Sequence, residues 1–265
     1  MTAEHHDRPT LYYDDTGTGT PILFVHAFPM HGAMWRPQIA ALSGEARCIV
    51  PDLPGFGRSA GGGPWTMDRF ADDLAGVLDD AGVSRAVVCG LSLGGYVAFA
   101  LWRRHPERFR ALVLADTRAG SDTDEGRDKR RATIALAERE GTAAVVEQAM
   151  TGLIGRSTRE RSPDRVAEAR AIASAACVEA IVGASEAMIA RPDSTPTLTT
   201  ITVPTLVLVG DEDALTPVRE ASLIADAIPG AHLEILPGAG HLSNLERPAS
   251  FTCAVRDFVA ALAES

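Results

Sequence analysis

The sequence has little cysteine and no long apolar run. Its four cysteines are widely spaced over 265 residues and show no paired spacing typical of metal ligands. We therefore predict no metal site and no disulfide framework, and instead small buried side chains in a reducing compartment. The four are Cys48, Cys89, Cys177 and Cys253. No stretch of about 18 apolar residues occurs, and residues 1–9 are polar, which predicts a cytoplasmic protein without a membrane span or secretory leader.

Positive charge is also scarce, and Lys129 is the only lysine. Lysine and arginine together number 25 against 35 acidic residues, which gives a formal net charge of −10. No basic run is available to offset phosphate groups, so the sequence disfavours nucleic acids and anionic membranes as partners. Neither class of partner is therefore expected. The sequence does not determine an oligomeric state.

The most informative stretch is residues 87–95, Val-Val-Cys-Gly-Leu-Ser-Leu-Gly-Gly. Residues 86–89 are an apolar run typical of a buried strand, and residues 96–102 begin an amphipathic helix. Between them, Ser92 is the centre of a Gly-x-Ser-x-Gly motif, whose small residues allow the strand and the helix to approach closely. A helix N-terminus favours negative charge on the group that the serine attacks. Ser92 is therefore the candidate nucleophile.

A serine hydroxyl needs a base to remove its proton and an acid to orient that base. His241 is the candidate base because it lies in a loop between an apolar run and a terminal helix. Asp213 follows a second apolar run, residues 205–209, and is the candidate acid. The order Ser92, Asp213, His241 is expected when acid and base lie on loops after later strands of one sheet.

Other polar residues near strand ends are alternatives for these roles. Asp116 ends the strand predicted over residues 111–115 and is the main rival for the acid, but Asp213 has the more informative Asp-x-x-Thr-Pro context. Asp211 is expected to serve a turn or a cap. His26 is an alternative base, although a structural role that braces its loop is favoured.

Together these motifs resemble the α/β-hydrolase-fold family. The resemblance rests on His-Ala-Phe-Pro at 26–29, the glycine- and proline-rich turn at 52–59, the serine motif, the Asp213 context and Gly-His at 240–241. It implies an α/β fold, with a mostly parallel central sheet flanked by helices and an inserted helical lid. Within the family the chain is most similar to small serine esterases, lactonases and cofactor-free perhydrolases. Members with an aspartate nucleophile are disfavoured because Ser92 occupies that position.

The resemblance also implies an oxyanion hole made by two backbone N–H groups. These belong to Phe28 and to Leu93, the residue after the nucleophile. Ala27 departs from the family, which commonly has glycine there, and its narrower range of dihedral angles bears on the conformation of this loop. The implied chemistry requires no metal and no organic cofactor.

The residue pattern changes between residues 118 and 196, where apolar residues recur at helical spacing and charged residues become more frequent. We predict a core of residues 1–117 and 197–265, with a helical lid over 118–196. At the N-terminal side, residues 11–14 are predicted as an edge strand, with no clear strand before Leu11. Apolar lid residues are candidates for the substrate pocket. They are Met150, Leu153, Ile154, Ile181 and Met188.

The expected activity is hydrolysis of a carboxylic ester or lactone of a small, largely apolar substrate, through an acyl-enzyme intermediate. Three alternatives remain open. A perhydrolase or haloperoxidase would use peroxide in place of water and would show peroxide-dependent halogenation. A hydrolase of carbon–carbon bonds would use the same serine. A non-catalytic ligand sensor would retain its product after a slow single turnover.

Overall fold

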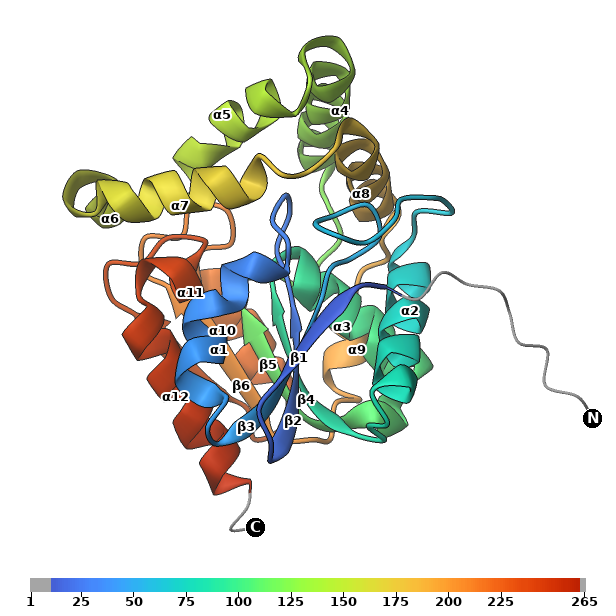
Figure 1. Cartoon of the computed structure of the whole chain (residues 1–265), viewed down its shortest axis with the longest axis vertical. Helices are drawn as coiled ribbons and strands as arrows, with labels where there is room; N and C mark the ends of the chain where they lie inside the picture. The colour runs from blue at the N-terminus through green and yellow to red at the C-terminus, as the bar shows by residue number, and fades with distance from the viewer. Residues whose placement is uncertain (1–10, 263–265) are drawn as a thin grey trace, which may run out of the picture.

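The computed structural model describes residues 11–262, and within them seven strands form one sheet (Figure 1). The strand order is β1-β3-β2-β4-β5-β6-β7. Every neighbouring pair is parallel except β1 and β3. The predicted mostly parallel sheet is thereby confirmed. The strands are β1 (Tyr13–Thr16), β2 (Thr20–Val25), β3 (Ala46–Pro51), β4 (Ala86–Leu91), β5 (Phe109–Ala115), β6 (Thr205–Gly210) and β7 (His232–Leu236).

Strand β1 lies at one edge of the sheet and is shifted two residues from the range predicted for it. Tyr13 is paired with Pro51, and Thr16 with Cys48. The prediction about a strand before Leu11 concerns residues outside the described range.

Side chains of the central strands alternate between two buried clusters on opposite faces of the sheet. In β2, Ile22 and Phe24 belong to one cluster, whereas Leu23 and Val25 belong to the other. Successive side chains of a strand point to opposite faces, so a strand covered by helices on both faces must be apolar throughout. This requirement explains the continuous apolar runs in the sequence.

Helices cover both faces of the sheet (Figure 1). Leu42 of α1 (Arg36–Leu42) and Phe251 of α12 (Pro248–Ala261) belong to the Ile22 cluster. On the other face, α2 (Met67–Asp80) and α3 (Leu93–Arg104) contribute to the Leu23 cluster. Thr66 caps α2 by accepting a hydrogen bond from the Arg69 N–H at 3.0 Å, as expected of threonine at a helix N-terminus. The other elements around the sheet are α9 (Thr195–Leu198), α10 (Val218–Ala227), α11 (Ser243–Glu246), η1 (Gly32–Trp35) and η2 (Pro106–Arg108).

Five further helices lie between β5 and β6 in the chain, and Figure 1 shows them grouped at one end of the sheet. We call this group the cap; it falls within the stretch predicted as a lid. Its helices are α4 (Asp124–Glu140), α5 (Thr142–Leu153), α6 (Arg156–Arg161), α7 (Pro163–Ala173) and α8 (Val178–Ala190).

Two carboxylates of the core hold the cap by accepting hydrogen bonds from its backbone. Glu246 accepts the Gly155 N–H at 2.9 Å and the Leu242 N–H at 3.2 Å. Glu212 accepts the Ser157 N–H at 2.7 Å and the Ser157 hydroxyl at 2.6 Å. These bonds satisfy polar groups where the cap begins α6, so cap and core are joined through defined contacts.

The cysteine prediction was half wrong. Cys48 and Cys89 are buried in β3 and β4, but Cys177 and Cys253 are exposed. Cys177 precedes α8, and Cys253 lies on the outer side of α12, whose buried face is formed by its neighbours. Sequence spacing alone did not separate these two environments.

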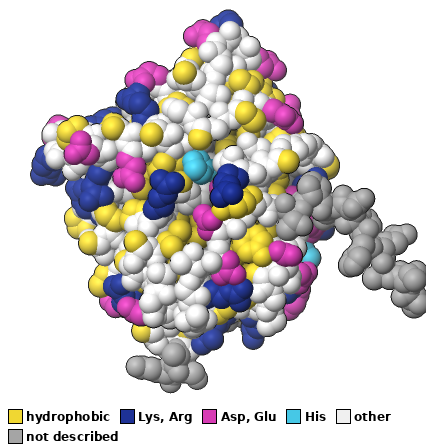
Figure 2. Space-filling view, in the orientation of Figure 1, with side chains coloured by type: hydrophobic (Ala, Val, Ile, Leu, Met, Phe, Trp, Pro, Cys, Tyr) yellow, Lys and Arg dark blue, Asp and Glu magenta, His cyan; other side chains and the backbone are white. Residues whose placement is uncertain are grey.

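In residues 11–262 no single helix is both long and apolar enough to cross a membrane. One pair, α7 and α8, meets the length and composition criteria when taken together, but it is bent by 92°. On the face drawn in Figure 2, basic and acidic side chains are interspersed and not gathered by sign.

Replacing Glu246 by Ala is expected to destabilise the protein, because the buried N–H groups of Gly155 and Leu242 lose their acceptor. The expected cost is about 1–3 kcal/mol for each N–H left unsatisfied. The control is Glu246→Gln, whose single amide oxygen preserves one of the two bonds and is expected to cost less. Urea unfolding measures both changes. An alanine variant as stable as the parent protein would refute this role for Glu246.

Candidate active site

Ser92 lies at the turn between β4 and α3, with φ of 54° and ψ of −109°. This backbone conformation is rare for a residue with a side chain and marks a strained turn. A Cβ atom at Gly90 would lie 2.3 Å from the Gly94 oxygen, and one at Gly94 would lie 2.2 Å from the Val25 oxygen. No larger residue fits at either position, which is the close approach expected from the sequence. The turn thus needs glycine on both sides of the serine.

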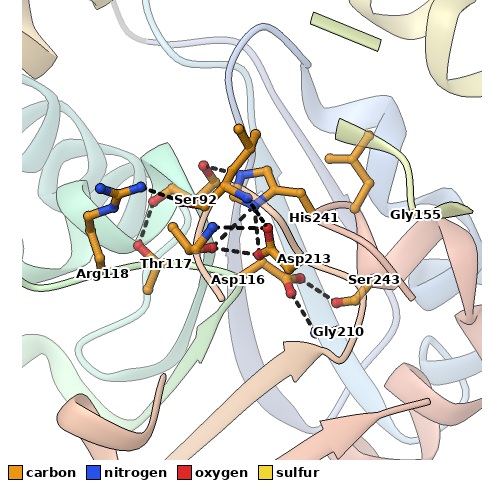
Figure 3. A network of polar contacts seen from close by, with 12 residues as sticks. Ser92, Asp116, Thr117, Arg118, Gly155, Gly210, Asp213, His241 and Ser243 are labelled. Carbon is orange, nitrogen blue, oxygen red and sulfur yellow. Dashed lines mark hydrogen bonds and ion pairs between the residues drawn. The ribbon is translucent and has the colours of Figure 1, made fainter. Parts of the chain in front are cut away.

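Ser92, His241 and Asp213 form a continuous chain of hydrogen bonds (Figure 3). His241 Nε2 is 2.8 Å from Ser92 Oγ, and His241 Nδ1 is 2.9 Å from Asp213 Oδ2. The side chains of His241 and Asp213 are almost inaccessible to solvent. Because a carboxylate only accepts, Nδ1 carries the proton toward Asp213 and Nε2 is left to accept from the serine hydroxyl.

The carboxylate of Asp213 is fixed by the residues that follow it. Oδ1 accepts the N–H groups of Leu215 at 2.8 Å and Thr216 at 3.0 Å, and Oδ2 accepts the Thr216 hydroxyl at 2.6 Å. Burial raises the pKa of this carboxyl, but the favourable electrostatic interaction with His241 and the hydrogen bonds from His241 and Thr216 outweigh it. The net pKa lies below its ordinary value, so Asp213 is an anion beside the imidazole.

Asp116, the rival acid, has other partners. Its Oδ1 accepts the Gly210 N–H at 2.9 Å, and its Oδ2 is hydrogen-bonded to the Ser243 hydroxyl (Figure 3). In the described part of the chain it forms no hydrogen bond to His241. Complete burial and the negative charge of Asp213 raise its pKa well above the ordinary value, despite the hydrogen bonds from Ser243 and Gly210. The geometry therefore favours Asp213 as the partner of the imidazole.

Both ring nitrogens of His26 are engaged with backbone groups. Nδ1 is 2.9 Å from the Ala27 oxygen, and Nε2 accepts the Leu53 N–H at 3.0 Å. Burial lowers the pKa of this imidazole to about 4, although the Ala27 oxygen and Asp52 oppose the shift. A neutral ring without a free nitrogen braces its loop and is not available as a base. Asp211 has the expected turn role, since it accepts the Gly238 N–H at 2.6 Å.

The two N–H groups assigned to an oxyanion hole belong to Phe28 and Leu93. Among residues 11–262, neither amide has a hydrogen-bond partner. Leu93 is the first residue of α3, where N–H groups lack intrahelical acceptors. Phe28 follows the braced loop and lines the same cavity as Ser92 and His241. Both donors are therefore free to bind a ligand oxygen.

A cavity of about 400 Å³ contains Ser92 and His241 in its wall. Leu153 and Met188 line it, as predicted from the lid sequence. Met150, Ile154 and Ile181 do not line it and instead are packed into the two buried clusters. Helical spacing identified the apolar faces of the cap helices. It did not distinguish residues packed in the buried clusters from residues that line the cavity. That part of the pocket prediction is corrected.

Several polar lining residues were missed by sequence reasoning. Arg118 has the clearest signal in retrospect, because it follows Asp116 closely at the carboxyl end of β5, where loops of parallel sheets form sites. In residues 11–262 no group of three or more histidine, cysteine or acidic side chains is arranged to hold a metal ion. The other polar lining residues that were missed include Tyr96, Asp122, Glu125, Lys129, Arg130 and Thr216, and the apolar Leu215 was missed as well.

Replacing Asp116 by Asn is expected to stabilise the protein increasingly as pH rises from about 5 to 8. The raised pKa of Asp116 means that the unfolded chain releases this proton at lower pH than the folded protein, so the carboxyl costs stability as pH increases. Asparagine keeps an acceptor for Gly210 and does not titrate. Urea unfolding of both proteins at pH 5, 6.5 and 8 measures the difference. A difference that is constant or falls with pH would contradict the expectation.

Comparison with known proteins agrees with this geometry. The family model described as alpha/beta hydrolase fold matches residues 20–248. An esterase from Thermogutta terrifontis superposes with a TM-score of 0.92 at 40% identity, over 95% of this chain and 93% of that one. An enol-lactonase from Burkholderia xenovorans LB400 gives 0.87 at 31% identity, over 94% and 96%. The 3-oxoadipate enol-lactonase 2 of Acinetobacter baylyi is 29% identical over 94% of this chain and 88% of its own length. The chain belongs to the alpha/beta hydrolase family.

Proposed function

We propose that this protein is a serine hydrolase that cleaves a carboxylic ester or lactone of a small molecule through an acyl-enzyme intermediate. The observation that carries the proposal is the hydrogen-bonded chain from Ser92 through His241 to Asp213 at the wall of a cavity. The similarity to an esterase and to enol-lactonases supports the same reaction class. Residues 118–196 would act as the lid over this site.

In the first half of the reaction, Ser92 Oγ attacks the carbonyl carbon while His241 Nε2 takes its proton. Asp213 holds the imidazole in the tautomer that leaves Nε2 free, and it stabilises the imidazolium that forms. The carbonyl oxygen becomes an oxyanion that accepts hydrogen bonds from the N–H groups of Phe28 and Leu93. Each such donor contributes about 3 kcal/mol to stabilising the transition state.

Collapse of this intermediate breaks the bond to the leaving oxygen, which takes the proton from His241. For a lactone the leaving oxygen stays attached to the acyl chain. Water then loses a proton to His241 and attacks the acyl carbon, and Ser92 regains its proton as the acid product leaves. Both halves use the same base and the same oxyanion donors.

Removing the nucleophile tests the proposal directly. Steady-state hydrolysis of p-nitrophenyl esters from acetate to dodecanoate is expected to show a chain-length optimum, because the cavity has a limited volume. Ser92→Ala is expected to lower kcat by at least about 10³-fold, since no acyl-enzyme can form. Its thermal unfolding midpoint serves as the control for folding. Undiminished turnover by the folded alanine variant would exclude Ser92 as the nucleophile.

The two buried carboxylates offer a matched pair of variants. Asp213→Asn is expected to lower kcat by about 10⁴-fold, because an amide at that position favours the wrong imidazole tautomer. Asp116→Asn, which changes a carboxyl without a bond to His241, is expected to retain turnover. The comparison uses kcat on one p-nitrophenyl ester at pH 8. Equal losses in both variants would contradict the assignment of the acid.

A further inference from the structure

The wall of the active-site cavity carries five charged side chains. Three are basic and two acidic, so the wall has an excess of one positive charge. They are Arg118, Asp122, Glu125, Lys129 and Arg130. Which of these charges is compensated decides what the cavity can bind.

Four of the five have partners of opposite charge. Asp122 forms ion pairs with Arg130 and with Arg191, and the latter contact measures 2.9 Å between groups at most 4% exposed. Together these two arginines hold the pKa of Asp122 below its ordinary value, although burial raises it. Glu125 pairs with Lys129 at 2.7 Å. Among the five, Arg118 alone has no partner of opposite charge within residues 11–262.

Among residues 11–262, no carboxylate lies within ion-pair distance of Arg118. One of its terminal nitrogens donates to the Leu215 oxygen, and its buried Nε has no hydrogen-bond partner. A guanidinium presents five donors in a planar fork, so a single carbonyl leaves most of them unused. Burying an unused donor of a charged group is costly unless a ligand satisfies the group.

Arg118 is held close to the nucleophile. The hydroxyl of its neighbour Thr117 donates a hydrogen bond to the backbone carbonyl oxygen of Ser92 at 2.9 Å. Figure 3 shows Arg118 beside Ser92. Apolar side chains line the same cavity. They include Phe28, Leu153, Met188 and Leu215. The cavity thus combines a reacting serine, an apolar wall and one uncompensated guanidinium.

We propose that Arg118 binds a carboxylate carried by the substrate, so that the substrate is an ester or lactone with an apolar linker and a second, anionic end. A carboxylate matches the planar fork of a guanidinium and can accept two of the donors that Arg118 leaves unused. The inference rests on the proposed hydrolase function and refines the expectation of a largely apolar substrate.

The test compares two esters that differ only at the far end of the acyl chain. Ethyl hydrogen adipate carries a carboxylate where ethyl hexanoate carries a methyl group. The parent protein is expected to have a kcat/KM at least about 10-fold higher for the adipate half-ester. In Arg118→Met this preference is expected to vanish through a raised KM of the half-ester, with ethyl hexanoate changed less than about threefold. Arg118→Lys keeps the charge and is expected to retain part of the preference.

Three outcomes would overturn the assignment. The first is that the parent protein hydrolyses both esters equally well. The second is that Arg118→Met keeps the preference for the half-ester. An equal loss on both esters in Arg118→Met would show that the arginine only supports the Leu215 loop.

A binding measurement separates this inference from the proposed function. If the parent protein cleaves neither these two esters nor the p-nitrophenyl esters, the hydrolase proposal fails, and calorimetry of ethyl hydrogen adipate with Ser92→Ala still tests Arg118. Binding that is lost in Ser92→Ala/Arg118→Met supports the carboxylate site. Failure of the half-ester to bind Ser92→Ala, or equal binding to the double variant, refutes it.

Discussion

The backbone contact between Gly94 and Val25 is the constraint on which the site depends. It brings the start of α3 against the end of β2, and this contact exists only because Gly94 lacks a side chain. The approach forces Ser92 into its strained conformation and leaves the N–H of Leu93 at an open helix terminus. It also places the loop after β2, which carries Phe28, at the same cavity. One steric condition therefore accounts for the positions of the candidate nucleophile and both candidate oxyanion donors.

Two buried carboxylates near this turn show how the fold assigns different chemistry to one residue type. Asp116 follows β5 and Asp213 follows the neighbouring β6. Asp213 is stabilised as an anion by His241 and by Thr216, whereas Asp116 has a raised pKa because it is buried near that anion. Like charges in a low-dielectric region cannot both ionise freely, so the two pKa values move apart. The acid that orients a base must be the anion.

The cap contributes both the shape of the cavity and most of its charge. Core carboxylates at Glu212 and Glu246 bind the backbone at the start of α6, close in sequence to Asp213 and His241 respectively. These hydrogen bonds thereby connect the cap to the loops that carry Asp213 and His241. Within the cavity, ion pairs neutralise four of the five charged side chains. Within residues 11–262, the guanidinium of Arg118 is the charged group of this wall that has no such partner.

The strand pattern, the serine turn and the chain order of Ser92, Asp213 and His241 could be read from the sequence. These follow from short-range rules: a strand buried on both faces must be apolar throughout, and a tight strand-to-helix turn requires glycine. The catalytic roles of Ser92, Asp213 and His241 remain predictions until variants are measured.

The folded chain was needed to show which carboxylate contacts His241, which cap residues line the cavity and which charged side chain has no partner of opposite charge. Asp116 and Asp213 each follow a strand. They differ in their partners because the loop that carries His241 places the imidazole against Asp213, whereas Asp116 accepts the Gly210 N–H. Met150 and Leu153 share one helix, yet only Leu153 reaches the cavity, because packing of α5 sets its rotation. Arg118 is uncompensated because Arg130 and Arg191, from two cap segments, converge on Asp122. Such pairings depend on distances between segments far apart in the chain, which no local pattern encodes.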